Sequence, residues 1–408
     1  MPRYNGGFIG TDGLDAPDAP TIDSVTAGNE QVSVAFTDAG GGTSDTTSFV
    51  AQVASSGDNY SAGSNTGSSS PIVVSSLSNG TSYTAKVWAI NAYGTSAPSD
   101  ASSSFTPSFQ RAVIAGGWSG SEHNTIDYVS ITSTGNATDF GDLVITRRNY
   151  GGGIGSTTRG VFTGGYNPSV GPDAASMDYI TFASTGNASD FGDMFLARRQ
   201  HGMMSNNTRG LSFGDLGEGN DIEYITIAST GNGTDFGNLT QGTDDVAAGS
   251  GSSTRGVIGG GTTSGNVTNV ISYITFGSTG NATDFGDLSL ARRLLASSSS
   301  STRAIFGGGS SSTSVASFRD EIDYITIAST GNAQDFGDLS VAGQYLSSTS
   351  GGNTRSIFTG RKPNNSSDGD NTIDYVTIAS TGNATDFGDL TVARSQNAAT
   401  SNSHGGVQ

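Results

Sequence analysis

The stretch Ile126-Asp-Tyr-Val-Ser-Ile-Thr-Ser-Thr-Gly-Asn-Ala-Thr-Asp-Phe-Gly-Asp-Leu143 decides the fold, because close copies of it recur along the chain. The tyrosine of this motif stands at positions 128, 179, 224, 273, 324 and 375, so the copies are 45 to 51 residues apart. The variation in length is confined to stretches rich in Gly, Ser and Asn. These observations predict six structural units built in the same way.

Each unit contains four short bursts of apolar residues that are typical of strands. In the second unit we expect strands at residues 178–183, 190–196, 199–208 and 210–213. A turn is expected at Ser184-Thr-Gly-Asn187, because Gly and Asn adopt positive φ at little cost. Four strands in about 50 residues are typical of a propeller blade, whereas solenoid coils are shorter and helical repeats need a period of about 3.6 residues. The sequence therefore predicts an all-β chain with a six-bladed β-propeller.

The ends of the repeat region predict how the propeller closes. The region opens with a second strand at residues 111–115 and ends with an unpaired first strand at about 396–404. We expect this C-terminal strand to complete the first blade, which would remove free sheet edges. The expected inner strands, such as residues 297–301, consist of Gly, Ser and Ala and predict a narrow, weakly polar channel.

A second motif gives the repeats a family resemblance. A Thr-Arg pair precedes an apolar strand at Arg159, Arg209, Arg255, Arg303 and Arg355, and Arg111 begins the series. The order of an Arg-led strand, a strand ending in Gly-Gly, a Tyr-bearing strand, a turn, an aromatic residue and Leu resembles the kelch repeat. Phe stands where kelch units usually carry Trp, at positions 140, 191, 236, 285, 336 and 387. The resemblance implies a kelch-like propeller over residues 108–408.

Residues 17–107 have a different pattern, in which large apolar residues alternate with small or polar ones, as in Val32-Ser-Val-Ala-Phe36. This alternation is typical of half-buried strands in a β-sandwich. The stretch from Leu77 to Gly94 resembles the part of fibronectin type III domains that runs from strand E to strand G. The resemblance implies that the hydroxyl of Tyr83 bonds to upstream backbone and that Phe36 replaces the usual core Trp. We expect this domain to be a spacer or docking module, with ligand binding as the alternative.

Composition excludes several classes of function. The chain has 36 acidic and 18 basic residues, and a net charge of -18 disfavours nucleic acid and anionic membrane surfaces as partners. The absence of Cys excludes disulfides, thiolate metal sites and cysteine nucleophiles. No apolar run approaches the length of a membrane span, and the N-terminus lacks the apolar run of a secretory signal. We therefore expect the protein to be made in a cytoplasm without export.

The Asp-rich turns are the one candidate metal site. Asn136, Asp139 and Asp142 recur in most units, and clustered oxygen ligands suit Ca²⁺. The competing and favoured interpretation is that these side chains cap backbone groups. The three histidines stand at unrelated repeat positions, so we expect no catalytic residues, no metal site and no cofactor other than this calcium alternative.

Candidate contact residues come from the loops between the second and third strands, which vary most among the units. Recognition commonly resides on variable loops over a rigid scaffold. Trp118, Tyr166 and Phe318 are therefore candidate contact residues, and ordinary loop packing is the alternative. Arginine pairs such as Arg147-Arg148 suggest either capture of an acidic sugar or, as we favour, ion pairs with carboxylates of the neighbouring blade, such as Asp178.

The opening MPRYNGGFIG and the STGNATDFGDL repeats resemble those of structural proteins of marine tailed phages, particularly cyanophage-like myoviruses. The resemblance implies a non-enzymatic virion protein in multiple copies, a fibre-like or adhesin-like decoration of the capsid or tail. Residues 1–16 would dock on other virion proteins, and the propeller would face outward to contact host-surface glycans. The alternatives are a bacterial extracellular adhesin or matrix protein and a glycan-acting enzyme.

Overall fold

The computed structural model describes residues 15–56, 59–108, 110–148, 153–169, 171, 174–217, 219–245, 249–313, 317–363 and 369–407. Among these residues the chain is all-β: every element is a strand except one short 3-10 turn, Gly405–Val407, and all sheets are antiparallel. The chain divides into two compact units, Met1–Phe109 and Gln110–Gln408. The expected docking tail, residues 1–16, lies outside the described residues except for Asp15 and Ala16.

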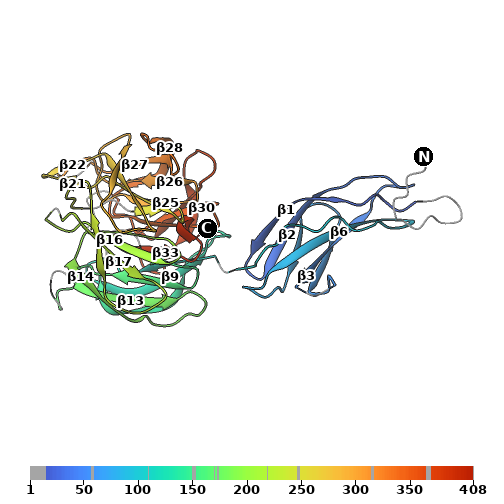
Figure 1. The fold of residues 1–408 in the computed structure, drawn as a ribbon, viewed down its shortest axis with the longest axis horizontal. Helices are drawn as coiled ribbons and strands as arrows, with labels where there is room; N and C mark the ends of the chain where they lie inside the picture. The colour runs from blue at the N-terminus through green and yellow to red at the C-terminus, as the bar shows by residue number, and fades with distance from the viewer. Residues whose placement is uncertain are drawn as a thin grey trace. The chain divides into compact units, whose positions relative to one another are not determined.

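The first unit contains two sheets that enclose one core (Figure 1). Their strand orders are β1 (Thr21–Gly28), β2 (Gln31–Thr37), β5 (Ile72–Ser75), and β4 (Gly63–Gly67), β3 (Ser48–Ser55), β6 (Tyr83–Asn91), β7 (Gly94–Thr95). Phe36 is buried against Phe49, with 4.7 Å between ring centroids. The hydroxyl of Tyr83 accepts the N–H of Ser78 at 3.1 Å, which confirms the predicted bond to upstream backbone.

An irregular segment replaces a final strand beside β6. Ser96, Ser99 and Ser102 each donate their backbone N–H to a β6 carbonyl, and each hydroxyl accepts the N–H of the same β6 residue. The segment therefore advances by three residues for every two residues of β6. Its serine hydroxyls supply the acceptors that a regular strand would provide from its backbone.

The second unit contains six four-stranded sheets, here numbered 1 to 6 in chain order (Figure 1). Sheet 1 is β33 (Ala398–Ser401), β8 (Arg111–Ala115), β9 (His123–Ser130), β10 (Thr138–Arg147); sheet 2 is β11 (Ile154–Gly155), β12 (Arg159–Thr163), β13 (Ala174–Thr181), β14 (Ser189–Arg198). Sheet 3 is β15 (Gly202–Ser205), β16 (Arg209–Phe213), β17 (Asp221–Thr226), β18 (Thr234–Asn238); sheet 4 is β19 (Gly249–Gly251), β20 (Arg255–Gly259), β23 (Val270–Thr275), β24 (Thr283–Asp287). Sheet 5 is β25 (Ala296–Ser299), β26 (Arg303–Gly307), β27 (Arg319–Thr326), β28 (Gln334–Gly343); sheet 6 is β29 (Ser347–Gly351), β30 (Arg355–Thr359), β31 (Thr372–Thr377), β32 (Thr385–Asp389). The short pair β21 (Thr262–Thr263) and β22 (Asn266–Val267) extends a loop of sheet 4.

The first strands of the six sheets contact one another in cyclic order, and β29 contacts β33 to complete the cycle. As the strand count predicted, the C-terminal strand β33 pairs with β8, from Ala398 opposite Ala115 to Ser401 opposite Ala112. The first strands are shorter than expected. The strand placed at residues 199–208 is only β15, Gly202–Ser205, because Gln200 has a positive φ of 53° and the side chain of Asn206 caps the following turn.

Arg111 and the five arginines of the Thr-Arg pairs each join their own sheet to the next one. Each guanidinium lies on the tyrosine ring of its own sheet and donates to a backbone carbonyl that follows the third strand of the next sheet. The donor–acceptor pairs are Arg111–Phe182, Arg159–Ile227, Arg209–Phe276, Arg255–Ile327, Arg303–Ile378 and Arg355–Ile131. The last pair, at 3.2 Å, links sheet 6 to sheet 1.

The Ser-Thr-Gly-Asn turn of each sheet lies on the outer strand of the preceding sheet. Between sheets 4 and 5, Gly331 donates its N–H to the carbonyl of Phe285 at 2.8 Å, and the Asn332 side chain accepts the N–H of Asp287 at 3.1 Å. The turn approaches so closely that a Cβ on Gly286 would lie 2.5 Å from the Gly331 oxygen. The same contacts occur at all six junctions.

Buried polar pairs lie at all six junctions: four are ion pairs between neighbouring sheets, one is an ion pair within sheet 6 whose partners both bond to Ser340 of sheet 5, and one is uncharged. Arginine pairs with a third-strand carboxylate in Arg147–Asp178, Arg198–Glu223, Arg292–Asp323, Arg361–Asp374 and Arg394–Asp127. The first of these confirms the favoured interpretation for Arg147, whereas Arg148 pairs with Glu122 of its own sheet. At the remaining junction the hydroxyls of Thr240 and Ser272 are hydrogen-bonded at 2.6 Å.

The pairing of β33 predicts a global effect of C-terminal truncation. Deletion of residues 395–408 removes one strand of sheet 1 and leaves the edge of β8 unpaired. We expect the unfolding temperature of the second unit to fall by at least about 10 °C, since each kcal/mol shifts Tm by roughly 2–4 °C in domains of this size. Scanning calorimetry measures this change, with the first unit's transition as the internal control. A truncated chain that melts like the full chain would contradict the closure.

The junction turns predict a contrast between two glycines with similar backbone. Gly286 and Gly280 have φ of 147° and 155°, but only a Cβ on Gly286 would meet the neighbouring sheet. We expect Gly286→Ala to lower the free energy of unfolding by about 2–4 kcal/mol and Gly280→Ala by about 1–2 kcal/mol, because only the first adds a steric clash to the backbone strain. Urea denaturation of both variants gives the comparison. Equal losses would show that the close approach contributes nothing.

Candidate functional site

One end of the six sheets carries side chains that differ from sheet to sheet. After each second strand, a residue pairs through its backbone with the residue that follows the preceding sheet's fourth strand. The six pairs are Trp118–Ser395, Tyr166–Arg148, Leu216–Arg199, Thr262–Asp244, Ser310–Arg293 and Lys362–Gln344. We call the surface formed by these residues and the loops around them the loop face. The Ser-Thr-Gly-Asn turns lie at the opposite end of the strands and are nearly identical in all sheets.

The loop face brings together two of the three predicted contact residues. The guanidinium carbon of Arg148 lies 4.5 Å from the ring centroid of Trp118 and 4.3 Å from that of Tyr166. Its Nε lies 3.5 Å from the carboxylate of Glu122. A cation between two aromatic faces is held by the ring quadrupoles as well as by its ion pair. Arg199 extends the cluster, 5.8 Å from the ring of Tyr166.

Phe318, the third predicted contact residue, lies elsewhere on the loop face. It forms an isolated bridge with Ser310 in the loop before β27 and is half-buried. From the sequence, the three contact residues were chosen because each lies in a variable loop. That choice missed that Trp118, Tyr166 and Ser310 occupy the same position in their sheets. The signal was present, because Trp118, Tyr166 and Ser310 each follow a Gly-Gly pair directly.

The basic residues of the second unit have three distinct uses. Six arginines donate to the next sheet's carbonyls and five form the buried ion pairs. The others are Arg148, Arg199, Arg293, Arg319 and Lys362. All five lie on the loop face, where Arg293 pairs with Asp245 and Arg319 with Glu321. The loop face therefore carries every basic group that the framework does not use.

The Asp-rich turns contribute to the contacts between sheets. The side-chain oxygen of Asn136 accepts the N–H of Asp389 at 3.1 Å, and the N–H of Asp142 donates to Asn187 in the same way. The capping interpretation therefore holds for Asn136. Asp139 is exposed on β10, and in the part of the chain that is described no three His, Asp or Glu side chains converge as metal ligands. Calcium binding at these turns stays a hypothesis.

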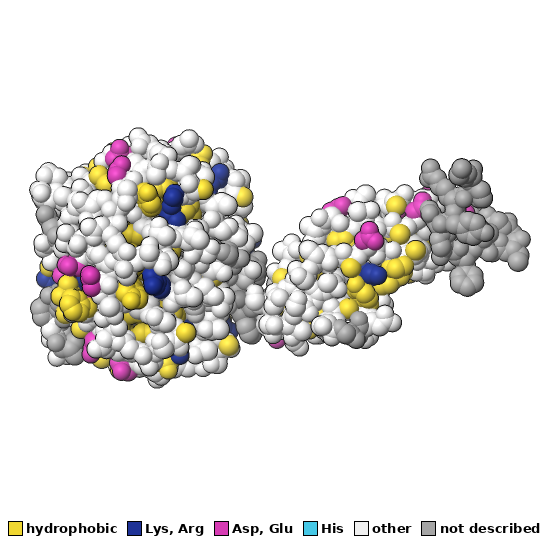
Figure 2. Space-filling view, viewed as in Figure 1, with side chains coloured by type: hydrophobic (Ala, Val, Ile, Leu, Met, Phe, Trp, Pro, Cys, Tyr) yellow, Lys and Arg dark blue, Asp and Glu magenta, His cyan; other side chains and the backbone are white. Residues whose placement is uncertain are grey.

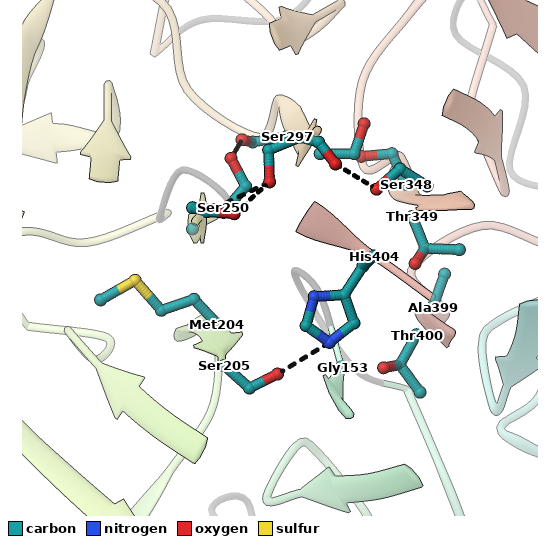
Figure 3. A pocket seen from close by; sticks show the side chains of 15 residues that line it. Gly153, Met204, Ser205, Ser250, Ser297, Ser348, Thr349, Ala399, Thr400 and His404 are labelled. Atoms are coloured by element: carbon teal, nitrogen blue, oxygen red, sulfur yellow. Dashed lines mark hydrogen bonds between the residues drawn. The ribbon is translucent and has the colours of Figure 1, made fainter. Parts of the chain in front are cut away.

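A small cavity lies among the first strands of the six sheets (Figure 3). Its volume is about 30 Å³, and most of the residues that line it are Gly, Ser and Thr. His404, from the C-terminal turn, points into it between Ser205 and Thr400. Gly405 and Gly406 follow and lie against the carbonyls of Ser300 and Ser205, where a Cβ would overlap those oxygens. The volume suits one or two water molecules and is too small for a sugar.

The imidazole of His404 has a defined neutral form. Its Nε2 lies 3.0 Å from the carbonyl of Gly155, so Nε2 carries the proton, and its Nδ1 accepts the N–H of Gly406 at 3.1 Å. Ser205 lies 3.3 Å from the ring but donates its hydroxyl to the carbonyl of Gly155. Because the serine proton is used in this bond, the pair has a structural role and does not form a nucleophile–base dyad.

No protein-family model matches the chain, and no curated protein matches it. The described residues also contain no helix with the length and hydrophobicity that a bilayer crossing requires. The inference of function therefore depends on the loop face and on the framework that supports it.

His404 predicts a pH dependence of stability. Burial lowers the pKa of His404 from 6.5 to about 4. The unfolded chain binds this proton at a higher pH than the folded chain, so its contribution to stability is lost as the pH falls from about 6.5 to about 4. Gln can replace both hydrogen bonds but does not bind a proton. Between these pH values we therefore expect the His404→Gln variant to lose less unfolding free energy than the wild-type chain, by on the order of 3 kcal/mol. Urea denaturation at pH 7.5 and pH 4.5 tests this, and equal losses in the two proteins would refute it.

Proposed function

We propose that the chain is a non-enzymatic structural protein of a tailed-phage virion. Under this proposal the first unit is a fibronectin type III-like sandwich and the second is a six-bladed kelch-like β-propeller. The six four-stranded sheets, the cyclic contacts of their first strands and the pairing of β33 with β8 support the propeller. The two-sheet core and the bond between Tyr83 and Ser78 support the sandwich.

One observation carries the proposal: the turn contacts and the arginine–carbonyl bonds recur at every junction, whereas the side chains of the loop face differ. A catalytic protein needs one sheet to depart from the others by a converging set of reactive groups. The departures here are aromatic and charged side chains on loops, spread over several sheets. A rigid scaffold with one varied loop surface is suited to recognition.

The chemistry of the loop face favours a saccharide partner. Trp118 and Tyr166 offer apolar rings, and Arg148 and Arg199 offer hydrogen-bond donors beside them. Saccharides present both apolar C–H faces and hydroxyls, so they match this combination. We infer that the loop face is directed outward to host-surface glycans, and that residues 1–16 attach each of many copies to other virion proteins.

Particle fractionation tests the assignment to a virion. In a density gradient of a phage lysate, an antibody against the chain should detect it in the band of intact particles. Detection on the surface of uninfected bacteria would instead support an adhesin, and turnover of a polysaccharide by the purified chain would support an enzyme. Either outcome would overturn the proposal.

Substitutions on the loop face test its role. We expect Trp118→Ala and Tyr166→Ala each to reduce adsorption of the purified chain to host cells by at least about fivefold, because each removes an apolar ring. Thr262→Ala is the matched control, since Thr262 occupies the equivalent position of sheet 4. Unchanged adsorption of both aromatic variants would remove the loop face from the proposal.

A further inference from the structure

Both tryptophans of the chain lie at a surface. Trp88 and Trp118 are half-buried, whereas the buried aromatic residues of both cores are Phe and Tyr. Each Trp also has a tyrosine and a basic group nearby. Trp118 belongs to the loop face, but Trp88 belongs to the first unit and has no role in the function proposed above.

Trp88 lies on the outer face of the sheet that contains β3 and β6. The side chains of β6 alternate, so that Ala85, Val87 and Ala89 enter the core while Thr84, Lys86 and Trp88 face outward. Trp88 and Lys86 lie opposite Val50 and Gln52 of β3. The regular pairing of β6 with β3 therefore gives the outward row a fixed spacing.

Tyr60 completes a corner of aromatic rings above this row. Its ring centroid lies 6.4 Å from that of Trp88, and the two ring planes meet at 77°. The ammonium of Lys86 lies 5.0 Å from the Tyr60 ring, and the hydroxyls of Tyr60 and Thr84 are 3.3 Å apart. Tyr60 has a φ of 56°, a conformation that is costly for an aromatic residue. Its ring is thus placed over the sheet at the cost of backbone strain.

Charge singles out the same place. Lys86 is the only basic residue among the described residues of the first unit, and none of their carboxylates lies within ion-pair distance of it. Figure 2 shows hydrophobic side chains around a basic group on this unit. Two polar side chains lie close by: Thr84 is hydrogen-bonded to Tyr60, and Gln52 lies opposite Lys86. The patch is one or two rings wide, whereas a protein interface needs a contiguous surface of many residues.

We propose that Trp88, Tyr60 and Lys86 form a second saccharide-binding platform, on the first unit. The apolar face of a pyranose ring packs on Trp88, with Tyr60 as the side wall, and the Lys86 ammonium donates hydrogen bonds to ring hydroxyls or to a sugar carboxylate. Perpendicular aromatic rings with one donor at the corner match a flat ligand that has an apolar face and a polar edge. This platform is independent of the loop face and extends saccharide contact to the first unit.

Titration of the full chain with two polysaccharides tests the platform. Dextran is a neutral pyranose polymer, and alginate is a pyranose polymer that carries carboxylates. We expect at least one of them to bind, and Trp88→Ala to weaken that binding at least about tenfold in isothermal calorimetry. Tyr93→Ala is the matched control, because Tyr93 is an aromatic residue 46% exposed on the same unit. Lys86→Gln, which leaves the rings in place, should weaken alginate more than dextran.

Fluorescence localises the ligand without relying on a loss of binding. In Trp118→Phe, Trp88 is the only tryptophan, so its emission should shift to shorter wavelength when the bound polymer covers it. The inference is overturned if neither polymer binds, if Trp88→Ala binds like the wild-type chain, or if the emission does not change. If Trp118→Ala loses polymer binding and Trp88→Ala keeps it, the platform on the first unit is also overturned, while the loop face and the proposed function stay intact.

Discussion

The close approach of neighbouring sheets is the constraint on which the second unit depends. At each junction a Gly in the turn of one sheet lies against a Gly in the outer strand of the preceding sheet, as Gly186 lies against Gly141. The last junction joins Gly135 to Gly388, residues more than half the chain apart. Because the sheets contact one another in a cycle, a change in the distance between two of them would displace the other sheets as well. This requirement explains why Ser-Thr-Gly-Asn and Asp-Phe-Gly differ so little among the six sheets: their glycines allow the short distance between the two backbones.

Charge has a secondary part in this framework. Four junctions are crossed by a buried ion pair, a fifth is bridged by Ser340 bonded to the Arg361–Asp374 pair of sheet 6, and the junction of Thr240 and Ser272 uses two hydroxyls. Burial of an ion pair often contributes little net stability, whereas removal of one partner leaves an uncompensated charge. The pairs are therefore better understood as a means of specifying which strands meet. With so many arginines inside, the outer surface keeps most of the acidic residues and only a few basic ones.

The sequence predicted the elements that depend on a local pattern. The repeated tyrosine, the alternating apolar residues and the count of strands were sufficient for the six sheets and for the pairing of β33 with β8. Contacts between sheets were beyond this reasoning: the partner of Asn136 is Asp389, and no periodicity within one unit indicates it. His404 stands outside the repeat, so chance was the natural interpretation, yet the structure places it in the cavity among the first strands of the six sheets. Trp88 lay within a predicted strand, but the sequence did not indicate that the ring of Tyr60 would lie beside it.

The distribution of aromatic residues separates scaffold from surface. In every sheet of the second unit a Phe of the outer strand packs edge-on against the repeat tyrosine, with centroids 5.9 to 6.1 Å apart, and an arginine lies on that tyrosine. Phe satisfies this packing because it has no polar atom that needs a partner in the core. A half-buried Trp, in contrast, leaves part of its apolar area in water and stabilises the fold less than a fully buried one would. The placement of both Trp residues outward, each beside a tyrosine and a cation, is therefore what the two proposed binding surfaces require.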